Sequence, residues 1–352
     1  MPGRTDFDIE TNVYRRPSDI PRTVWRQLHS DPLNANILLP CLVKASNYER
    51  RGGRMSKDTL WIACFSKTDH SALPDEQGRV LDFFVSCTDG PIDKYPIFIY
   101  SSHPREHLHD TFLLPRMARI ASELQRNVAP ERTFSVFALK PAAEVFSEVW
   151  TQQTGIAVEE QPYYAATFSY CTRETFVQRK ASMFPGEVWD LRMAALSDLD
   201  AVASLCHGFA EGSEPFVLTR ERAFEEASLL IDQGQVWVHE VKRNGQPSAI
   251  ASIVAVTRET ASVSAITKVY TNPDFRRRGF AERLVRKVTQ ELLQSGKEFV
   301  VLYVAHDNKA AAKVYHRVGF AGLASDANEV TPGVEPWLEL GFDQSVVRLG
   351  HW

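Results

Sequence analysis

The most informative stretch of the sequence is VYTNPDFRRRGFA, residues 269–281. It has the pattern of a strand end, a short basic loop and the start of an amphipathic helix. The first turn of a helix presents unpaired N–H groups and the positive end of the helix dipole, so it attracts anions. Gly279 lets the backbone approach an anion closely, and Arg276, Arg277 and Arg278 add guanidinium groups that match phosphate oxygens. The stretch therefore predicts a binding site for a diphosphate.

The spacing of this stretch is R-x-x-G-x-A, over residues 276–281. It is neither G-x-G-x-x-G nor a Walker loop, which disfavours a dinucleotide or nucleoside triphosphate site. Taken alone, the spacing also fits a solvated run of arginines at a helix start. The residues that follow favour the functional interpretation, because they continue as an apolar strand at Phe299–Val304, then Asp307-Asn308 and a helix that contains Tyr315.

The whole set, from about Ser262 to Phe320, resembles the GNAT superfamily of acyl-CoA-dependent N-acyltransferases. The matching residues are Val269-Tyr270, Pro273, Arg276-x-x-Gly279-x-Ala281, Asn308 and Tyr315-x-x-x-Gly319-Phe320. The resemblance implies acetyl-CoA as the co-substrate and two strands that separate beside the thioester. It implies a cofactor site with backbone contacts to pantetheine and to the pyrophosphate, made by Val269, Tyr270, Thr271, Arg276, Arg277, Arg278, Gly279, Phe280 and Ala281, and a contact of Asn308 with the cofactor arm. We expect no metal.

Tyr315 is the expected catalytic acid. Acyl transfer to an amine expels a thiolate, and a phenol within hydrogen-bond reach can donate a proton to it. The alternative is a core tyrosine on the apolar face of its helix.

The general base is not evident, because the strand 262–271 contains no carboxylate. Glu211 and Glu214 lie on a loop expected to face the acceptor, and they are the candidate catalytic carboxylates. They would act directly, through water, or by attracting a cationic amine, and two solvated loop acids are an equally good interpretation.

An internal repeat indicates that the fold is duplicated. Ile99-Tyr100-Ser101 resembles Val269-Tyr270-Thr271, and Ala142-Ala143-Glu144-Val145-Phe146 resembles Ala311-Ala312-Lys313-Val314-Tyr315, at offsets of 270 − 100 = 170 and 315 − 146 = 169. We expect an α/β (α+β) chain of tandem GNAT-like lobes, each a mixed, mostly antiparallel sheet flanked by helices. The lobes would be residues 1–180 and 187–352, with a linker at Cys171–Gly186.

The first lobe departs from the pattern of the second. Its corresponding loop, His103–Asp110, has no glycine and carries acids, and Phe146 replaces Tyr315. We therefore expect it to bind no CoA, and to support the catalytic lobe and shape the acceptor cleft. The imidazoles of His103, His107 and His109 do not have a recognised metal-ligand spacing.

Periodicity and turn signals predict the elements. Expected helices cover Ile20–His29, Leu33–Ser46, Thr111–Gln125, Pro141–Thr154, a helix opened by Ser197 as N-cap, Thr219–Asp232, Phe280–Gln294 and Lys309–Val318. Expected strands cover Leu60–Ser66, Val80–Ser86, Pro96–Ser101, Phe134–Leu139, Tyr163–Cys171, Val188–Met193, Val236–Val241, Ser248–Val256, Ser262–Thr271, Phe299–Val304 and Trp337–Leu340.

The composition of the 352 residues is that of an ordinary globular protein, with 44% hydrophobic and 24% charged residues. The balance of 40 basic and 44 acidic residues disfavours a nucleic-acid binder. The five scattered cysteines indicate free thiols in a reducing compartment. No signal peptide or membrane span is evident, so we expect a cytoplasmic protein.

The sequence therefore predicts an acyl-CoA-dependent N-acyltransferase whose acceptor is an amine, most simply a small molecule. Two alternatives stay open. One is an enzyme of this fold that uses the thioester for hydrolysis, decarboxylation or carbon–carbon bond formation, and the other is a non-catalytic sensor of acyl-CoA. The acceptor and the oligomeric state are not encoded in any motif.

Overall fold

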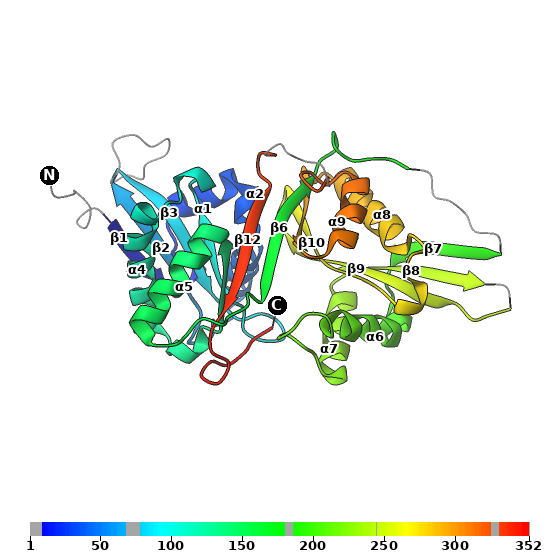
Figure 1. Cartoon of the computed structure of the whole chain (residues 1–352), viewed down its shortest axis with the longest axis horizontal. Coiled ribbons are helices and arrows are strands. Elements are labelled where there is room, and N and C mark those ends of the chain that lie inside the picture. Colours follow the sequence, from blue (N-terminus) through cyan, green and yellow to red (C-terminus); the bar gives the residue numbers. More distant parts are fainter. Residues whose placement is uncertain (1–8, 68–77, 180–185, 244, 325–330, 352) are drawn as a thin grey trace. The chain divides into compact units, whose positions relative to one another are not determined.

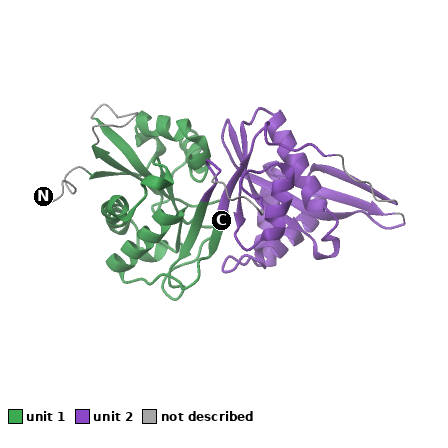
Figure 2. Ribbon diagram, turned by 45° about the horizontal axis from the view of Figure 1, so that its top comes forward, with its two compact units in different colours: residues 1–165, 336–352 green, residues 166–335 purple. Residues whose placement is uncertain are grey.

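The computed structural model describes residues 9–67, 78–179, 186–243, 245–324 and 331–351. The chain divides into two compact units (Figure 2). Unit 1 comprises Met1–Ala165 and Pro336–Trp352, and unit 2 comprises Ala166–Glu335.

Unit 1 is a mixed sheet with helices packed against it (Figure 1). Its strand order is β1-β2-β3-β4-β5-β12, in which only β4 and β5 are parallel. The strands are β1 (Ile9–Tyr14), β2 (Leu60–Lys67), β3 (Arg79–Cys87), β4 (Ile97–Ser101), β5 (Ser135–Leu139) and β12 (Glu335–Gly341). The helices are α1 (Arg22–Ser30), α2 (Pro32–Ala35), α3 (Leu39–Arg50), α4 (Asp110–Asn127) and α5 (Lys140–Thr154).

Unit 2 repeats this arrangement. Its strand order is β7-β8-β9-β10-β11-β6, and only β10 and β11 are parallel. The strands are β7 (Glu187–Met193), β8 (Val236–Arg243), β9 (Ala249–Glu259), β10 (Val263–Thr271), β11 (Phe299–Ala305) and β6 (Tyr164–Cys171). The helices are α6 (Leu199–Ala210), α7 (Arg220–Asp232), α8 (Phe280–Gln294) and α9 (Lys309–Val318).

The matching strand orders confirm the duplicated α/β fold, with a mixed, mostly antiparallel sheet in each unit. The register supports the repeat in detail. Tyr100 pairs with β3 as Tyr270 pairs with β9. Just after each strand, Ser102 N donates to Asp82 O (3.0 Å) and Asn272 N donates to Ala251 O (2.9 Å). Asp82 and Ala251 therefore occupy equivalent positions.

The last strand of each sheet is exchanged along the chain. β6 follows the helices of unit 1 but pairs with β11 in unit 2, and β12, near the C-terminus, pairs with β5 in unit 1. The compact units consequently differ from the expected lobes 1–180 and 187–352. A strand's apolar pattern shows that it pairs, but not with which partner. Residues 180–185 of the expected linker lie outside the described residues.

Two layers of helices cover the sheet of unit 2. Alternate residues of β9 point to opposite faces, as in any strand. Val254 and Val256 pack in the core formed with α8 and α9, whereas Ile253 and Ala255 pack in the core formed with α6 and α7. The strand β10, which leads to the candidate site, is held between these two cores.

Three predictions about elements were wrong or incomplete. Strand β1 was not predicted. The predicted helix Leu33–Ser46 is two helices, because Pro40 begins a new helix near the start of α3 and a proline is disfavoured in a helix interior. Ser197 is not an N-cap. A short 3-10 turn precedes α6, and Asp198 accepts hydrogen bonds from Ala195 N (2.8 Å) and the Arg192 guanidinium (2.6 Å).

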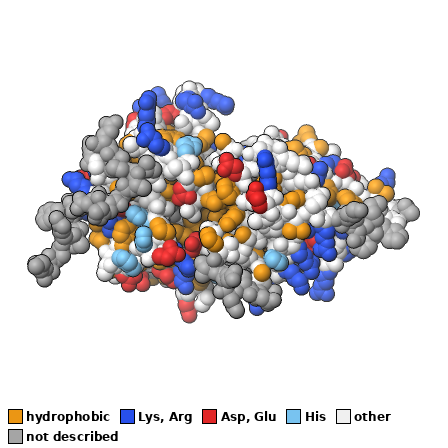
Figure 3. All heavy atoms as spheres, turned by 90° about the horizontal axis from the view of Figure 1, so that it is seen from above, with side chains coloured by type: hydrophobic (Ala, Val, Ile, Leu, Met, Phe, Trp, Pro, Cys, Tyr) orange, Lys and Arg blue, Asp and Glu red, His pale blue; other side chains and the backbone are white. Residues whose placement is uncertain are grey.

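The surface and the cysteines agree with the composition. Acidic, basic and hydrophobic side chains are interspersed over the face drawn in Figure 3. All five cysteines are free thiols, as predicted, and all but Cys41 are buried. Within the described ranges, each helix is too short or too polar to cross a bilayer.

His239 is a buried polar residue beneath the start of α8. Its Nδ1–H donates to the carbonyl oxygen of Phe280 at 3.3 Å, and its ring packs edge-on against the rings of Phe280 and Trp189 at 4.6 and 5.7 Å. Burial lowers the pKa of His239 from 6.5 to about 4. The imidazole is therefore neutral in the folded protein at neutral pH.

We expect His239 to make unit 2 sensitive to acid. In the unfolded chain, His239 takes up a proton as the pH falls through 6.5. In the folded protein, His239 takes up this proton only at about pH 4. Stability is therefore retained above pH 6.5 and lost between pH 6.5 and 4, by on the order of 3 kcal/mol. His239→Asn keeps a donor for Phe280 and does not titrate, so urea unfolding should show a shallower pH dependence. Equal slopes for the variant and the parent would contradict this expectation.

The exchange of β6 and β12 leads to a second expectation, about the stability of fragments of unit 2. A fragment 166–335 contains every strand of unit 2 and should unfold cooperatively, whereas a fragment 187–335 lacks β6 and leaves β11 as an unpaired apolar edge. We expect the shorter fragment to melt at least about 10 °C lower in circular dichroism, corresponding to a loss of about 3 kcal/mol. Identical melting curves would show that β6 is dispensable for unit 2.

Candidate functional site

The candidate site begins where β10 and β11 separate. The two strands pair from Val263↔Phe299 to Ile266↔Leu302, and no further pair joins them in the described part of the chain. On its other side β10 stays paired with β9 up to Thr271, with a register shift that leaves Thr267 as an extra residue. The β11-facing edge at Val269, Tyr270 and Thr271 is therefore open, which confirms the expected separation of the strands.

The loop after β10 has an unusual backbone. Arg277 has φ of 61° and Gly279 has φ of 74°. A left-handed conformation costs a non-glycine residue roughly 1–2 kcal/mol, so Arg277 is held there by the shape of the loop. A Cβ on Gly279 would lie 3.6 Å from Arg283 Nη1, which is an ordinary contact. Glycine is therefore favoured at residue 279 by its dihedral angle rather than by crowding.

Gly279 is also the N-cap of α8, so the helix starts directly at the loop. The N–H groups of Phe280, Ala281 and Glu282 belong to the first turn and have no acceptor within the helix. A turn with left-handed residues that leads directly into a helix N-terminus directs several backbone amides toward one place, which suits an anion. The geometry suits the diphosphate predicted from the sequence.

The acid in this first turn is neutralised by its own neighbours. Glu282 accepts from Arg286 at 3.0 Å and from Arg317 at 3.3 Å. Although burial alone raises the pKa of Glu282, these guanidinium groups lower it overall. Arg179 lies 3.4 Å from the same carboxylate, so Glu282 is a charged partner of three arginines, and its charge opposes an incoming anion less than an isolated carboxylate would.

The three loop arginines have different roles in the structure. Arg276 donates from Nε to Thr271 O and from Nη2 to Tyr270 Oη, both at 3.2 Å. Arg278 forms an ion pair with Glu187, a buried carboxylate that also accepts from Arg243 Nε at 2.8 Å. Among described residues, the exposed side chain of Arg277 has no hydrogen bond or ion pair. It is therefore the loop arginine most available to a ligand.

Tyr315 lies on α9 and is only 8% exposed. Its ring packs against Phe320 at 5.8 Å within the core that includes α8. Burial raises the pKa of its phenol well above the usual value. The side chain thus has the environment of a core residue and also holds a proton that it can donate.

Asn308 is the N-cap of α9. Its Oδ1 accepts from Ala311 N at 3.0 Å, and the residue is exposed. The carboxamide oxygen of Asn308 caps the helix, so its Nδ2 group is the part of the side chain that can donate to a ligand.

Glu211 and Glu214 lie in the exposed turn after α6. Glu211 Oε1 is 3.8 Å from Nδ1 of His207, its neighbour one helical turn earlier. Glu214 is also exposed. Among the described residues, no hydrogen bond links the carboxylate of Glu211 or Glu214 to the open edge of β10.

Unit 2 contains a buried ion pair that the sequence did not predict. Lys268 Nζ, on β10, lies 2.7 and 2.6 Å from the two carboxylate oxygens of Glu226, on α7. Their side chains are only 9% and 14% exposed. A lysine inside a strand of mainly apolar and small residues was the available signal, but its partner on a distant helix was not.

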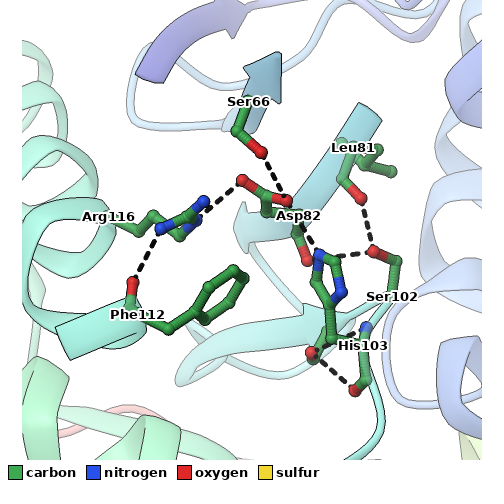
Figure 4. A network of polar contacts seen from close by, with 8 residues as sticks. Ser66, Leu81, Asp82, Ser102, His103, Phe112 and Arg116 are labelled. Atoms are coloured by element: carbon green, nitrogen blue, oxygen red, sulfur yellow. Dashed lines mark hydrogen bonds and ion pairs between the residues drawn. The ribbon is translucent and has the colours of Figure 1, made fainter. Parts of the chain in front are cut away.

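Unit 1 closes the equivalent region with its own side chains. Asp82, fully buried, accepts from Ser66 Oγ (3.0 Å), His103 Nε2 (2.8 Å) and Arg116 Nε (2.7 Å), as Figure 4 shows. His109 caps α4, its Nδ1 accepting from Phe112 N at 3.2 Å. The first turn of α4 is therefore already capped, in contrast to that of α8. The described residues contain no group of three or more His, Cys, Asp or Glu suited to a metal.

Comparison with known proteins gives a family match within unit 2. Residues 198–320 match the model of the Acetyltransferase (GNAT) family. A curated relative, an uncharacterized N-acetyltransferase of Methanocaldococcus jannaschii, is 33% identical over 82 residues. That match covers 23% of this chain and spans only about a third (33%) of the relative's length.

Solved structures extend the similarity in fold to both units. A GCN5-related N-acetyltransferase from Sphaerobacter thermophilus aligns with a TM-score of 0.54 at 14% identity, covering 94% of each chain. A Drosophila protein aligns at 0.59 and 12% identity, covering 95% of this chain and 98% of that one. A tandem GNAT protein from the clavulanic acid biosynthesis pathway aligns at 0.51 and 13% identity, with the same coverage. The family match covers the separated strands, the loop and α9 of unit 2, and the two-lobed fold is shared with a tandem GNAT protein, so residues 198–320 resemble a GNAT domain within a tandem fold.

Proposed function

We propose that unit 2 is an acyl-CoA-dependent N-acyltransferase, most simply an acetyltransferase, whose acceptor is a small-molecule amine. The observation that carries the proposal is the open edge of β10 leading directly into a loop with left-handed Arg277 and Gly279 and the free start of α8. An extended chain with amide groups and a terminal diphosphate is complementary to this sequence of groups. The match of residues 198–320 to the GNAT family supports the same ligand.

The cofactor would bind along this edge. The pantetheine amides would pair with the backbone of Val269, Tyr270 and Thr271 as an added strand does. The diphosphate would be held by the amides of residues 276–281 and by the guanidinium of Arg277. Asn308 would donate from Nδ2 to the cofactor arm.

The transfer would take place in a ternary complex. The neutral amine attacks the thioester carbonyl, the C–N bond forms, and the C–S bond breaks. The departing thiolate takes the proton of Tyr315, whose raised pKa keeps the phenol protonated until that step. Glu211 and Glu214 would attract the cationic amine or relay its proton through water. Holding both reactants in place would supply much of the rate.

We propose no acyl-CoA site in unit 1. Asp82 stands where unit 2 has Ala251, His109 caps the helix, and Phe146 stands in place of Tyr315. The proposed compartment is the cytoplasm, because buried free thiols suit a reducing environment.

We expect Gly279→Ala to weaken binding of CoA by at least about 10-fold, since a left-handed alanine costs about 1–2 kcal/mol and the loop would relax away from its shape. Isothermal titration calorimetry with CoA measures this. Gly245→Ala is the matched control, because Gly245 has the same φ of 74° with open space around it, in the turn between β8 and β9. Equal affinities for the two variants would argue against a diphosphate site at the loop.

We expect Tyr315→Phe to lower kcat by about 10²-fold or more while the Kd for acetyl-CoA stays unchanged, because only proton donation is removed. The assay follows acylated product by mass spectrometry and free thiol with a chromogenic reagent. Tyr303→Phe, at a half-buried tyrosine of β11 whose phenol pKa is also raised, is the control. Thiol release without an acylated amine would instead favour the hydrolytic or decarboxylating alternative, and CoA binding without turnover would favour a sensor.

A further inference from the structure

The ion pair between Glu226 and Lys268 lies beside the proposed thioester site. Lys268 is the residue immediately after the irregularity at Thr267, where β10 has already left β11. Its ammonium is directed to the α6 and α7 side of the sheet, where it contacts both oxygens of Glu226 and lies 4.8 Å from the centre of the Phe209 ring. Opposite charges are thus held at the place from which an acceptor would approach an acyl group on β10.

Stability does not explain the pair. A buried ion pair loses its hydration, and replacing it by apolar residues of similar volume is often neutral or stabilising. The duplicated unit provides the comparison within this chain. Counting from Tyr100 and Tyr270, Phe98 occupies the position of Lys268, and Phe98 is buried in the sheet of unit 1. The fold therefore accepts an apolar residue here, and the charges are found in the unit that has the open loop.

The pair also restricts the ligands that can use it. An acceptor with only an ammonium group would have to separate Glu226 from Lys268 and leave the lysine charge buried without a partner. Removing one half of a buried pair is strongly unfavourable, because the remaining charge is buried without compensation. An acceptor with both an ammonium and a carboxylate replaces the internal pair by two new pairs and leaves no charge uncompensated.

We propose that Glu226 and Lys268 bind the acceptor, and that the acceptor is a small amine of the amino-acid class, with a carboxylate close to its amino group. Glu226 binds the ammonium, and Lys268, steadied by the Phe209 ring, binds the carboxylate. The ammonium loses its proton to water before it attacks. The inference rests on the proposed acyl transfer by unit 2.

The first test compares matched acceptors on the full chain with saturating acetyl-CoA. Each of the twenty standard amino acids is assayed beside its own carboxamide and its decarboxylated amine, with mass spectrometry of the product. We expect kcat/KM for the best amino acid to exceed that of its two analogues by about 30-fold or more, which corresponds to about 2 kcal/mol. Equal efficiencies, or no acylated amino acid although calorimetry shows bound CoA, would overturn the inference.

The second test removes the pair without leaving a lone buried charge. The double variant Glu226→Leu with Lys268→Met should keep its melting temperature and its Kd for CoA, while KM for the best amino acid rises by about 30-fold or more. Lys268→Met alone should bring the amino acid and its carboxamide to similar efficiency. Lys287→Met, in an exposed pair with Glu291, is the control. A double variant with unchanged KM would refute the inference, whereas failure of the parent protein to bind CoA would refute the proposed function itself.

Discussion

The separation of β10 from β11 after Ile266 is the constraint on which the site depends. A strand in the middle of a sheet normally uses its backbone groups on both sides, so an open edge inside a sheet has to be maintained by packing. Here α8 and α9 hold one face and α6 and α7 hold the other. Val269 and Lys268, as neighbours in a strand, face opposite sides of the sheet. The open edge that the proposed cofactor site needs follows from the loss of pairing between β10 and β11 after Ile266.

Much of this could be predicted from the sequence because it is encoded locally. The apolar periodicity of residues 280–294 and 309–318 predicted α8 and α9 at their observed bounds. Gly279 predicted a special backbone at the start of α8. The left-handed conformation of Arg277 was not predictable, because no intrinsic preference of arginine favours it.

The features that could not be predicted depend on contacts between segments that are distant in the sequence. The sequence spacing predicted the same phosphate-binding role for Arg276, Arg277 and Arg278. In the structure Arg278 instead forms an ion pair with Glu187. Glu226 and Lys268 are far apart in the chain and meet only through the packing of α7 on β10. The exchanged strands β6 and β12 belong to the same category, since their apolar patterns are compatible with either sheet.

The two units show how one scaffold can keep or lose a site through a few side chains. Strand order and the single parallel pair are the same in both. Unit 1 has a carboxylate, Asp82, with its own histidine and arginine partners, where unit 2 has Ala251. The difference between them is thus in side chains carried by equivalent positions, not in the order of the strands.

The exchange of β6 and β12 has a consequence for synthesis on the ribosome. A chain emerges from its N-terminus, so the helices and strands of unit 1 up to β5 are complete long before β12 leaves the exit tunnel. Until β12 has been synthesised, the β5 edge has no partner, and an unpaired apolar edge readily associates with other chains. Unit 2, whose segment 166–335 is continuous, closes its sheet earlier. The first sheet to begin forming is therefore completed only after every helix and strand of unit 2 has been made.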